Sequence, residues 1–528
     1  MDPALIERLR SDLLAADYSL ASVRSLLGEE ADDARLRGVF APARRSLAAR
    51  GEGGRGAGRL GTLVSALLLG AELTAAELDA AFPELGAAGC TALGLFAAVP
   101  TGRDAFRVAL SLNPVELVDA ESPAPVSWWI LSDLDDQLRG GPAAPEHVMG
   151  VGGATRSLIA QLPPGATERA LDLGTGCGIV ALHLALRGPV VATDLSARAI
   201  ELARANAALN GVSGIDFRVG DLFVPVAGER FSLIASNPPF VVTPRGGDEP
   251  AYVYRDGGLV GDALVARVIR EGAAFLADGG TLLCLANWEC PWGVDGLERV
   301  RGWILEAADA CGVGSSGAGS LGTESLGAWI MERDRVSPVR YAETWARDGG
   351  ARPGDAEFER LVEAWLADFA ARNIVAIGLG AIRIRRLEAP QPIVHAERAA
   401  GAFDPAPGVA LERAFAAGLA AAGMSDAEAL AARWILDPAV VEEREHTPGA
   451  EAPRAISLVT GSGIARRVTA DTLLAAAVGA CDGELSLGQI ADALATILEV
   501  DAGAASEALV AGVRELAWLG MIAPATAA

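Results

Sequence analysis

The sequence predicts an α/β protein in which an open, mostly parallel sheet is flanked by mainly helical N- and C-terminal domains. Three observations lead to this prediction. The chain has 528 residues, more than a single hydrophobic core usually organises, so several domains are expected. Short apolar runs in its middle part end in glycine or a polar residue, as parallel strands do at the edge of a sheet. Both ends carry alanine- and leucine-rich segments with helical periodicity.

The composition excludes several classes of protein. Hydrophobic residues make up 51% of the chain, which is enough for buried cores, and the formal net charge of −24 argues against bulk attraction to nucleic acid. The six cysteines have no paired short spacing, so neither a metal site nor a disulfide framework is predicted, and a reducing cytoplasm fits. The N-terminus lacks signal-peptide features, and the longest apolar run, residues 60–71, is too short to span a bilayer. We therefore expect a cytoplasmic protein without membrane partners.

Residues 1–125 are predicted to form a mainly helical domain. Helices are expected over residues 4–16, 19–27, 32–49, 60–69, 74–82 and 86–98. The glycine-rich stretch 51–59 lacks the Gly-Lys-Ser/Thr ending of a phosphate-binding loop and is interpreted as a linker. Three short helices followed by a strand and turn at 106–118 resemble a winged-helix fold. Because the third helix carries no Lys or Arg over residues 86–93, protein docking or substrate selection is favoured over nucleic-acid binding.

A glycine-rich turn opens the predicted sheet of residues 126–389. The apolar strand 170–173 runs into the sequence LDLGTGCG, which places Gly174, Gly176 and Gly178 between the strand and an apolar helix. Glycines at such a turn let the backbone approach a ligand closely, as in nucleotide-binding crevices. The segment 145–158 before it, which includes Gly152, Gly153 and Thr155, is expected either to close over this site or to form an ordinary helix start.

Three further strands are each followed by a polar motif. Strand 190–193 ends in Asp194, about 20 residues past the first strand, where a carboxylate can hold two ribose hydroxyls. Strand 217–219 ends at the sequence GDLF, residues 220–223, and strand 231–235 ends at NPPF, residues 237–240. Adjacent prolines lack N–H groups, so this corner offers oxygen acceptors and an aromatic ring to a planar polar substrate. A dehydrogenase or a nucleotide-free sheet explains the glycine turn but not this ordered series.

Later segments are expected to complete the sheet. A strand opened by the Gly-Gly turn at 279–280, together with strands 328–331 and 374–384, brings the number of strands to seven, and the chain between the last two is interpreted as an insertion. Its aromatic residues Trp345, Trp365 and Phe369 are predicted to be core. Residues 390–528, which follow several prolines, are expected to form a second mainly helical, winged-helix-like domain, with helices over 411–422, 425–436, 470–481, 486–498 and 504–519.

These motifs together resemble the class I S-adenosylmethionine-dependent methyltransferases. LDLGTGCG is similar to the first motif of that family, Asp194 to its ribose-binding acid, residues 220–223 to its adenine-side loop, and NPPF to its (N/D)PP(Y/F) signature. Residues 248–288 are similar to the branch that methylates glutamine in release factors. The resemblance implies a Rossmann-like seven-stranded methyltransferase sheet with S-adenosylmethionine as cofactor and S-adenosylhomocysteine as product.

The resemblance also implies a set of site residues and no metal. Asn237, Pro238 and Phe240 would be catalytic, and together with Pro239 they would bind the substrate. The remaining implied residues hold the cofactor, with Asn237 also contributing: Asp172, Gly174, Thr175, Gly176, Gly178, Asp194, Leu195, Asp221 and Leu222.

Three hypotheses of function follow. The first is methylation of a planar nitrogen, the amide of a glutamine in a protein or peptide. The second is methylation of adenine N6 or guanine N2 in ribosomal or transfer RNA, favoured by Phe240 where the glutamine branch usually has tyrosine and disfavoured by the net charge. The third is a non-catalytic regulator that senses the cofactor. A protein or peptide partner is favoured over RNA, and the sequence leaves the oligomeric state open.

Overall fold

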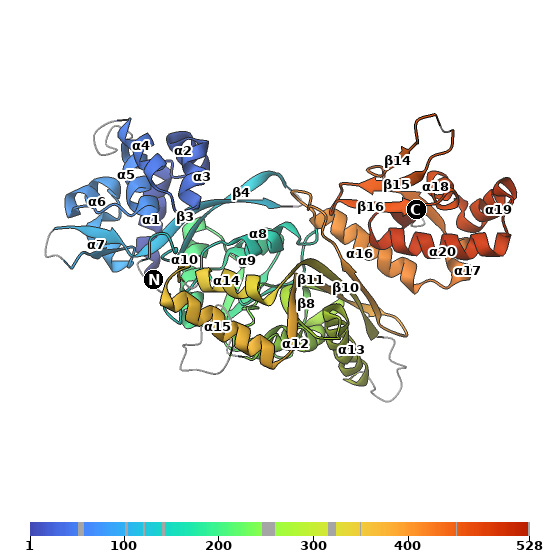
Figure 1. Ribbon diagram of the computed structural model, residues 1–528. Helices are drawn as coiled ribbons and strands as arrows, with labels where there is room; N and C mark the ends of the chain where they lie inside the picture. The colour runs from blue at the N-terminus through green and yellow to red at the C-terminus, as the bar shows by residue number, and fades with distance from the viewer. Residues whose placement is uncertain are drawn as a thin grey trace.

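The computed structural model describes residues 1–50, 58–100, 104–119, 122–139, 143–244, 259–314, 324–348, 350–449 and 451–525. Most of the glycine-rich stretch 51–59, most of the Gly/Ser-rich loop 312–322 and the start of the segment 248–288 lie outside these residues. The described chain forms three bodies in a row (Figure 1), with the N-terminal helices in blue, the central sheet in green to yellow and the C-terminal body in orange to red. No helix within these ranges has the length and apolar character needed to cross a membrane.

The N-terminal body is built from short helices, three of which begin at a capping side chain: Asp2, Ser19 and Thr74. They are α1 (Pro3–Ala15), α2 (Leu20–Leu27), α3 (Glu29–Leu36), α4 (Ala41–Ala48), α5 (Gly58–Leu63), the π-helix η2 (Val64–Leu68), α6 (Ala75–Ala81) and α7 (Gly86–Ala92). A capping box of Thr74 and Glu77 opens α6. The single helix predicted over 32–49 is instead two helices, because Gly38 has φ +80° and Pro42 begins a new helix. Strands β1 (Phe96–Ala98) and β2 (Phe106–Val108) pair antiparallel after α7.

A long hairpin connects this body to the sheet. Its strands are β3 (Leu110–Asp119) and β4 (Ser122–Asp133), which pair antiparallel. The Tyr18 hydroxyl donates to the Leu112 carbonyl at 2.9 Å, which ties the hairpin to the N-terminal helices. On its other side, the buried Asn206 side chain of α10 (Ala197–Asn210) bonds both the N–H and the C=O of Leu131. The hairpin is therefore held by both bodies.

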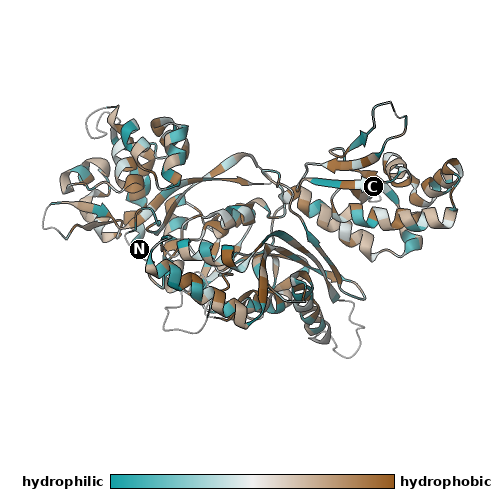
Figure 2. Cartoon of the chain, viewed as in Figure 1, coloured by the Kyte–Doolittle hydropathy of each residue, from teal (hydrophilic) through white to brown (hydrophobic). Residues whose placement is uncertain are grey.

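The central sheet has eight strands in the order β12-β10-β11-β9-β8-β5-β6-β7. They are β5 (Ala170–Leu173), β6 (Val190–Asp194), β7 (Ile215–Val219), β8 (Phe231–Ser236), β9 (Leu276–Pro291), β10 (Glu324–Val336), β11 (Ile374–Glu388) and β12 (Ile393–Arg398). Strands β5 to β9 are parallel, and β11 is antiparallel to both β9 and β10. Hydrophobic residues run along these strands in Figure 2. The helices α8 (Gly153–Ala160), α9 (Ile179–Leu184), α10, α12 (Ala263–Gly272) and α13 (Gly296–Gly314) accompany the sheet.

The prediction of seven strands was wrong by one. The eighth, β12, runs parallel to β10 and begins directly after Pro390 and Pro392, although these prolines predict a domain boundary. Proline removes a backbone donor but does not prevent a strand from starting one residue later at a sheet edge. The hairpin strand β4 likewise runs across position 125.

Two helices separate β10 from β11. They are α14 (Pro338–Asp348) and α15 (Ala356–Ala371), and we call residues 337–373 the insertion. Trp365 and Phe369 of α15 are buried, at 2% and 1% exposure, as predicted for core residues. Trp345 of α14 is only half-buried, so the prediction that it is core was incomplete.

The C-terminal body contains more strand than predicted. Its helices are α16 (Gly408–Gly423), α17 (Asp426–Ala431), α18 (Thr472–Gly479), α19 (Leu487–Leu498) and α20 (Ala502–Trp518). Its strands form two three-stranded sheets: β17 (Asp482–Ser486), β13 (Arg433–Leu436) and β18 (Ile522–Pro524), and β14 (Val441–Glu445), β15 (Ala455–Thr460) and β16 (Arg466–Ala470). The helix predicted over 425–436 ends at Ala431 because the chain turns extended at Ala432 to enter β13.

Candidate active site

A cavity of about 470 Å³ lies at the carboxyl edge of the sheet, where β8, β5, β6 and β7 end side by side. Parallel strands bring their carboxyl ends to one edge, and open α/β sheets bind ligands there. Every predicted site residue except Gly178 lines this cavity: Asp172, Gly174, Thr175, Gly176, Asp194, Leu195, Asp221, Leu222, Asn237, Pro238, Pro239 and Phe240. Motifs that are separate along the sequence therefore lie together in one continuous wall of the cavity.

The three glycines of the turn after β5 have different surroundings. Gly174 and Gly176 have φ +78° and +54°, and a Cβ on either would meet nothing within 4 Å, so open space faces their backbone. Gly178 has φ +87° at the N-cap of α9, and a Cβ there would lie 2.8 Å from the Ala203 Cβ. Gly178 therefore allows close packing of α9 against α10, and its contact with a ligand stays a prediction.

Asp172 lies beneath the glycine turn with 1% exposure. Its Oδ2 accepts hydrogen bonds from the Thr175 hydroxyl at 2.5 Å and from the Ala181 N–H at 2.9 Å. Burial raises the pKa of the Asp172 carboxyl to about 7, although both hydrogen bonds oppose that rise. These two bonds connect β5, the turn and α9, so Asp172 stabilises the shape of the turn.

Asp194 is fixed at the end of β6 by the neighbouring backbone. Its two oxygens accept from the Gly176 N–H at 2.9 Å and the Ser196 N–H at 2.8 Å. Burial raises the pKa of Asp194, and the hydrogen bonds from the Ser196, Gly176 and Leu195 backbones act against that rise. A carboxylate oxygen has more than one acceptor site, so each oxygen can still accept from a ligand hydroxyl.

The loop after β7 is shaped by backbone conformation. Gly220 has φ +158°, and a Cβ there would lie 2.5 Å from the Pro225 ring. Leu222 has φ +42°, an uncommon value for a residue with a side chain, and it lines the cavity. Asp221 is half-exposed and accepts from the Arg267 guanidinium at 2.8 Å. The loop therefore presents an apolar side chain to the cavity and an ion pair at its rim.

The corner at residues 237–240, which follows β8, carries the most informative polar atom. The Asn237 Nδ2 donates to the Thr155 hydroxyl at 3.2 Å. Its Oδ1 is buried and has no hydrogen-bond partner among the described residues. Buried carbonyl oxygens are normally paired, so an unpaired one at a cavity wall points to a ligand that donates a hydrogen bond.

Two groups of lining residues were missed or only weakly expected from sequence. The start of α8 contributes its N-cap residue Gly152 and, from its first turn, Gly153 and Thr155, whose glycines had suggested a closing loop. Trp345 and Asp348 reach the cavity from α14 of the insertion. Their only sequence signal was that the insertion is longer than the two strands need.

The charge of the cavity is acidic. Its described lining residues include one histidine, one cysteine and five carboxylic acids, with no Lys or Arg: His147, Cys177, Glu146, Asp172, Asp194, Asp221 and Asp348. His147 has a lowered pKa because of burial and the nearby Arg139, whose effect outweighs that of Asp133. Within the ranges that the structure describes, no group of three or more His, Cys, Asp or Glu side chains is arranged to hold a metal ion.

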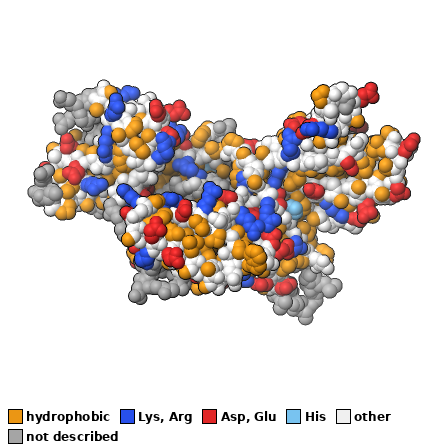
Figure 3. Space-filling model, viewed as in Figure 1, with side chains coloured by type: hydrophobic (Ala, Val, Ile, Leu, Met, Phe, Trp, Pro, Cys, Tyr) orange, Lys and Arg blue, Asp and Glu red, His pale blue; other side chains and the backbone are white. Residues whose placement is uncertain are grey.

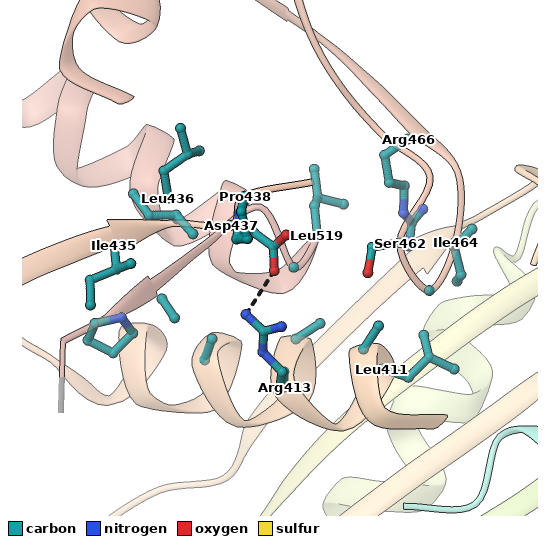
Figure 4. A pocket seen from close by; sticks show the side chains of 18 of the residues that line it. Leu411, Arg413, Ile435, Leu436, Asp437, Pro438, Ser462, Ile464, Arg466 and Leu519 are labelled. Carbon is teal, nitrogen blue, oxygen red and sulfur yellow. Dashed lines mark hydrogen bonds and ion pairs between the residues drawn. The ribbon is translucent and has the colours of Figure 1, made fainter. Parts of the chain in front are cut away.

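A second cavity, of about 200 Å³, lies in the C-terminal body (Figure 4). Arg413 of α16 pairs with Asp437 at 2.8 Å on one side, and Ser462 and Arg466 lie on the other. None of the residues predicted from the motifs lines it.

Comparisons with known proteins agree with the position of the first cavity. Residues 149–295 match the family model described as "Methyltransferase small domain", and residues 15–108 match a domain of unknown function, DUF7059. The release factor glutamine methyltransferase of Xylella fastidiosa (strain 9a5c) is 36% identical over 182 residues, which cover 30% of this chain and 66% of that protein.

Two further relatives share shorter regions. The ribosomal protein uL3 glutamine methyltransferase of Bradyrhizobium diazoefficiens is 38% identical over 135 residues, 23% of this chain and 41% of that protein. The ribosomal RNA small subunit methyltransferase C of Salmonella arizonae is 33% identical over 138 residues, 26% of this chain and 36% of that protein. The chain spans less than two thirds of the length of each of these three relatives. Its central domain is a class I S-adenosylmethionine-dependent methyltransferase domain, and part of it is similar in sequence to the release factor glutamine methyltransferases.

Proposed function

We propose that this protein transfers a methyl group from S-adenosylmethionine to the side-chain amide nitrogen of a glutamine in a protein. The observation that carries the proposal is the buried, unpaired Oδ1 of Asn237 at the wall of the cavity. A primary amide has two N–H groups to donate, so it satisfies this atom and has one donor left for a backbone carbonyl of the corner.

The corner would supply orientation and not a strong base. The lone pair of an amide nitrogen is delocalised, so the nitrogen reacts only when it is aligned with an electrophile. S-adenosylmethionine, when bound, supplies that electrophile as an activated methyl group. The Asn237 Oδ1 and the Pro238 carbonyl would hold the two N–H groups, and the Phe240 ring would lie against the flat amide. Fixed acceptors of this kind also stabilise the positive charge that develops on the nitrogen.

The rest of the wall fits the cofactor. The open space beside Gly174 and Gly176 admits a chain close to the backbone, and the Asp194 oxygens suit two ribose hydroxyls. Leu222 and the loop after β7 would cover the adenine. Asp172 would act on the cofactor through the turn that it shapes, and Leu195 and Thr175 would complete the contact.

The cavity's charge favours a protein acceptor over RNA. Its described wall has five acidic side chains and no Lys or Arg, whereas proteins that admit RNA need cations near the phosphates. Lys, Arg, Asp and Glu side chains are interspersed over the face seen in Figure 3. A base of ribosomal or transfer RNA is the second candidate, because Phe240 stands where the glutamine branch usually has tyrosine and because one relative is a ribosomal RNA methyltransferase.

The flanking bodies would choose the substrate. Both combine short helices with small antiparallel sheets, as winged-helix modules do, and the chain's net charge suits protein partners better than nucleic acid. In this proposal the domains comprise residues 1–125, 126–389 and 390–528, with the cytoplasm as the site of action.

The test uses the full chain, radiolabelled S-adenosylmethionine, and the protein and RNA fractions of a cell lysate. We expect label in the protein fraction, on glutamine after hydrolysis to amino acids under mild enzymatic conditions. Asn237→Ala should reduce the rate by at least about 100-fold, because the amide loses its main positioning contact. Asn113→Ala is the matched control, since Asn113 is half-buried on β3, bonds Asp135 and lies outside the cavity.

Each other outcome contradicts a part of the proposal. Label in RNA alone would show that the methyl acceptor is a nucleic-acid base and not a glutamine. Full activity of Asn237→Ala would remove the assigned role of the corner. Cofactor binding without label in either fraction would favour a regulator that senses the cofactor.

A further inference from the structure

The insertion between β10 and β11 is not needed to build the sheet. The two strands pair antiparallel over almost their whole length, as far as Val336 and Ile377, so a short turn is enough to connect them. The chain instead adds α14 and α15 at this point. The two helices lie side by side in Figure 1, drawn in yellow to orange, and both contact β11.

The insertion packs on the chain that directly follows the corner. Val241 and Val242 have 4% and 0% exposure and form one core cluster with Tyr341, Trp365 and Phe369. Phe240 and Trp345 both pack against this cluster, and both line the cavity. The position of the corner therefore depends on the insertion as well as on β8.

Tyr341 of α14 makes the polar part of this contact. Its side chain has 2% exposure, and its hydroxyl oxygen accepts from the Val242 N–H at 3.0 Å and from the Asn287 Nδ2 at 2.9 Å. Asn287 lies on β9, the strand next to β8, and is itself 2% exposed. One buried oxygen thus joins the insertion, the sheet and the residue two positions after Phe240.

The rings around Tyr341 restrict it further. Its ring centroid lies 5.5 Å from that of Trp365, 6.0 Å from that of Trp345 and 6.1 Å from that of Phe369. Aromatic pairs at these separations pack in defined orientations. A shift of α14 would therefore move the Trp345 side chain, which lines the cavity, together with the backbone of the corner.

We propose that the insertion is the acceptor-positioning element of this enzyme, with Tyr341 as the positioning residue that holds the 237–240 corner. The inference rests on the proposed methyl transfer, because it gives the corner a reactive nitrogen to align. It assigns no contact between Tyr341 and the substrate. Trp345 forms the part of the acceptor wall that the insertion supplies.

Tyr341→Phe tests the proposal with a minimal change. The ring stays, but the Val242 N–H and the Asn287 amide lose their shared acceptor in a buried place. We expect label transfer at saturating cofactor to fall about tenfold or more, because small misplacements of an aligned group are costly. The affinity for S-adenosylhomocysteine, measured by calorimetry, should change less than about twofold, since Asp194 is held by the backbones of Gly176 and Ser196 and not by Tyr341.

Tyr18→Phe is the matched control. Tyr18 is also fully buried, at 0% exposure, and its hydroxyl also makes a buried hydrogen bond, to Leu112 in the hairpin, and neither residue lines the cavity. It should lower the melting temperature in a similar way and leave the transfer rate of the folded protein unchanged. Equal loss of rate in Tyr18→Phe and Tyr341→Phe would overturn the positioning role.

Hydrogen exchange separates this inference from the proposed function. The Val242 amide should exchange at least about tenfold faster in Tyr341→Phe than in Tyr18→Phe, whether or not the enzyme transfers methyl groups. A wild-type chain that transfers no label, together with faster exchange at Val242, would refute the function and keep the structural role. Unchanged exchange at Val242 would refute the role itself. If Tyr341→Phe does not fold, Trp345→Ala, at a half-buried position, should slow transfer at saturating cofactor, and an unchanged rate would overturn the proposal.

Discussion

The carboxyl group of Asp172 is buried, which is unusual for an ionisable group. It is enclosed under the glycine turn, and burial outweighs two hydrogen bonds to give it a pKa of about 7. Its protonated form is therefore favoured in the folded chain, relative to an ordinary value of 3.8 in the unfolded chain. The same carboxyl group shapes the turn that faces the cavity through the hydrogen bonds that its Oδ2 accepts. Protonation of Asp172 and the geometry of the turn are therefore coupled.

This coupling predicts a pH-dependent effect of Asp172→Asn. A raised folded-state pKa gives stability that is fully present below about pH 4 and is lost as the pH rises to about 7. Each pKa unit corresponds to about 1.4 kcal/mol, so the loss amounts to ~4 kcal/mol. In urea unfolding at pH 5, 6, 7 and 8, the free energy of unfolding of Asp172→Asn should increase relative to that of the wild type as the pH rises. A difference that stays constant over this range would contradict the assigned titration.

At the scale of one element, the turn after β5 uses glycine for two physical purposes. Gly174 and Gly178 both have positive φ, +78° and +87°, but only Gly178 packs against a helix, at Ala203 of α10. Gly174→Ala should cost about 1–2 kcal/mol from backbone strain and weaken S-adenosylhomocysteine binding by at least about tenfold, because its Cβ enters the cavity. Gly178→Ala should cost more stability, by about 1–3 kcal/mol, because the Cβ also overlaps Ala203. Calorimetry and urea unfolding of the two variants check this, and equal losses in both measurements would contradict it.

The sequence allowed the cavity wall to be predicted because its residues follow directly on strands. Asp194, residues 220–222 and the corner at 237–240 each come where an apolar run ends, so parallel pairing alone brings them together. The insertion could not be placed in this way. Helical periodicity shows that Trp345 lies on a partly apolar face, but it does not show which surface that face meets.

The missed strand β12 has a similar cause. Residues 393–398 follow two prolines, which locally predict a boundary, and only pairing with the distant β10 makes them part of the sheet. Short strands such as β13 and β18 were also missed, because they are stabilised by partners far along the chain. Strands that depend on contacts with distant parts of the chain are therefore difficult to predict from the local sequence pattern.

At the scale of the whole molecule, the C-terminal body is joined to the sheet by aromatic stacking. The Trp518 ring of α20 stacks on His395 of β12 at 4.5 Å and lies 6.0 Å from Trp329 of β10. Ion pairs cross the same junction, including Arg466 with Glu397 at 2.6 Å. All described residues that line the first cavity, in contrast, lie between Glu146 and Asp348. The cofactor site and the junction are therefore separate parts of one chain.

This separation predicts how Trp518→Ala behaves. Trp518 has 5% exposure, so its truncation should destabilise the junction by about 3–5 kcal/mol and make the C-terminal body more accessible to protease. The affinity for S-adenosylhomocysteine should stay within about twofold, because no described residue of the cavity wall comes from that body. Trp292→Ala is the matched control, since Trp292 is 79% exposed and its loss should change neither protease sensitivity nor affinity. Limited proteolysis and calorimetry on the same samples test this prediction. If the affinity for S-adenosylhomocysteine falls as the protease sensitivity of the junction rises, the C-terminal body helps to shape the cofactor site.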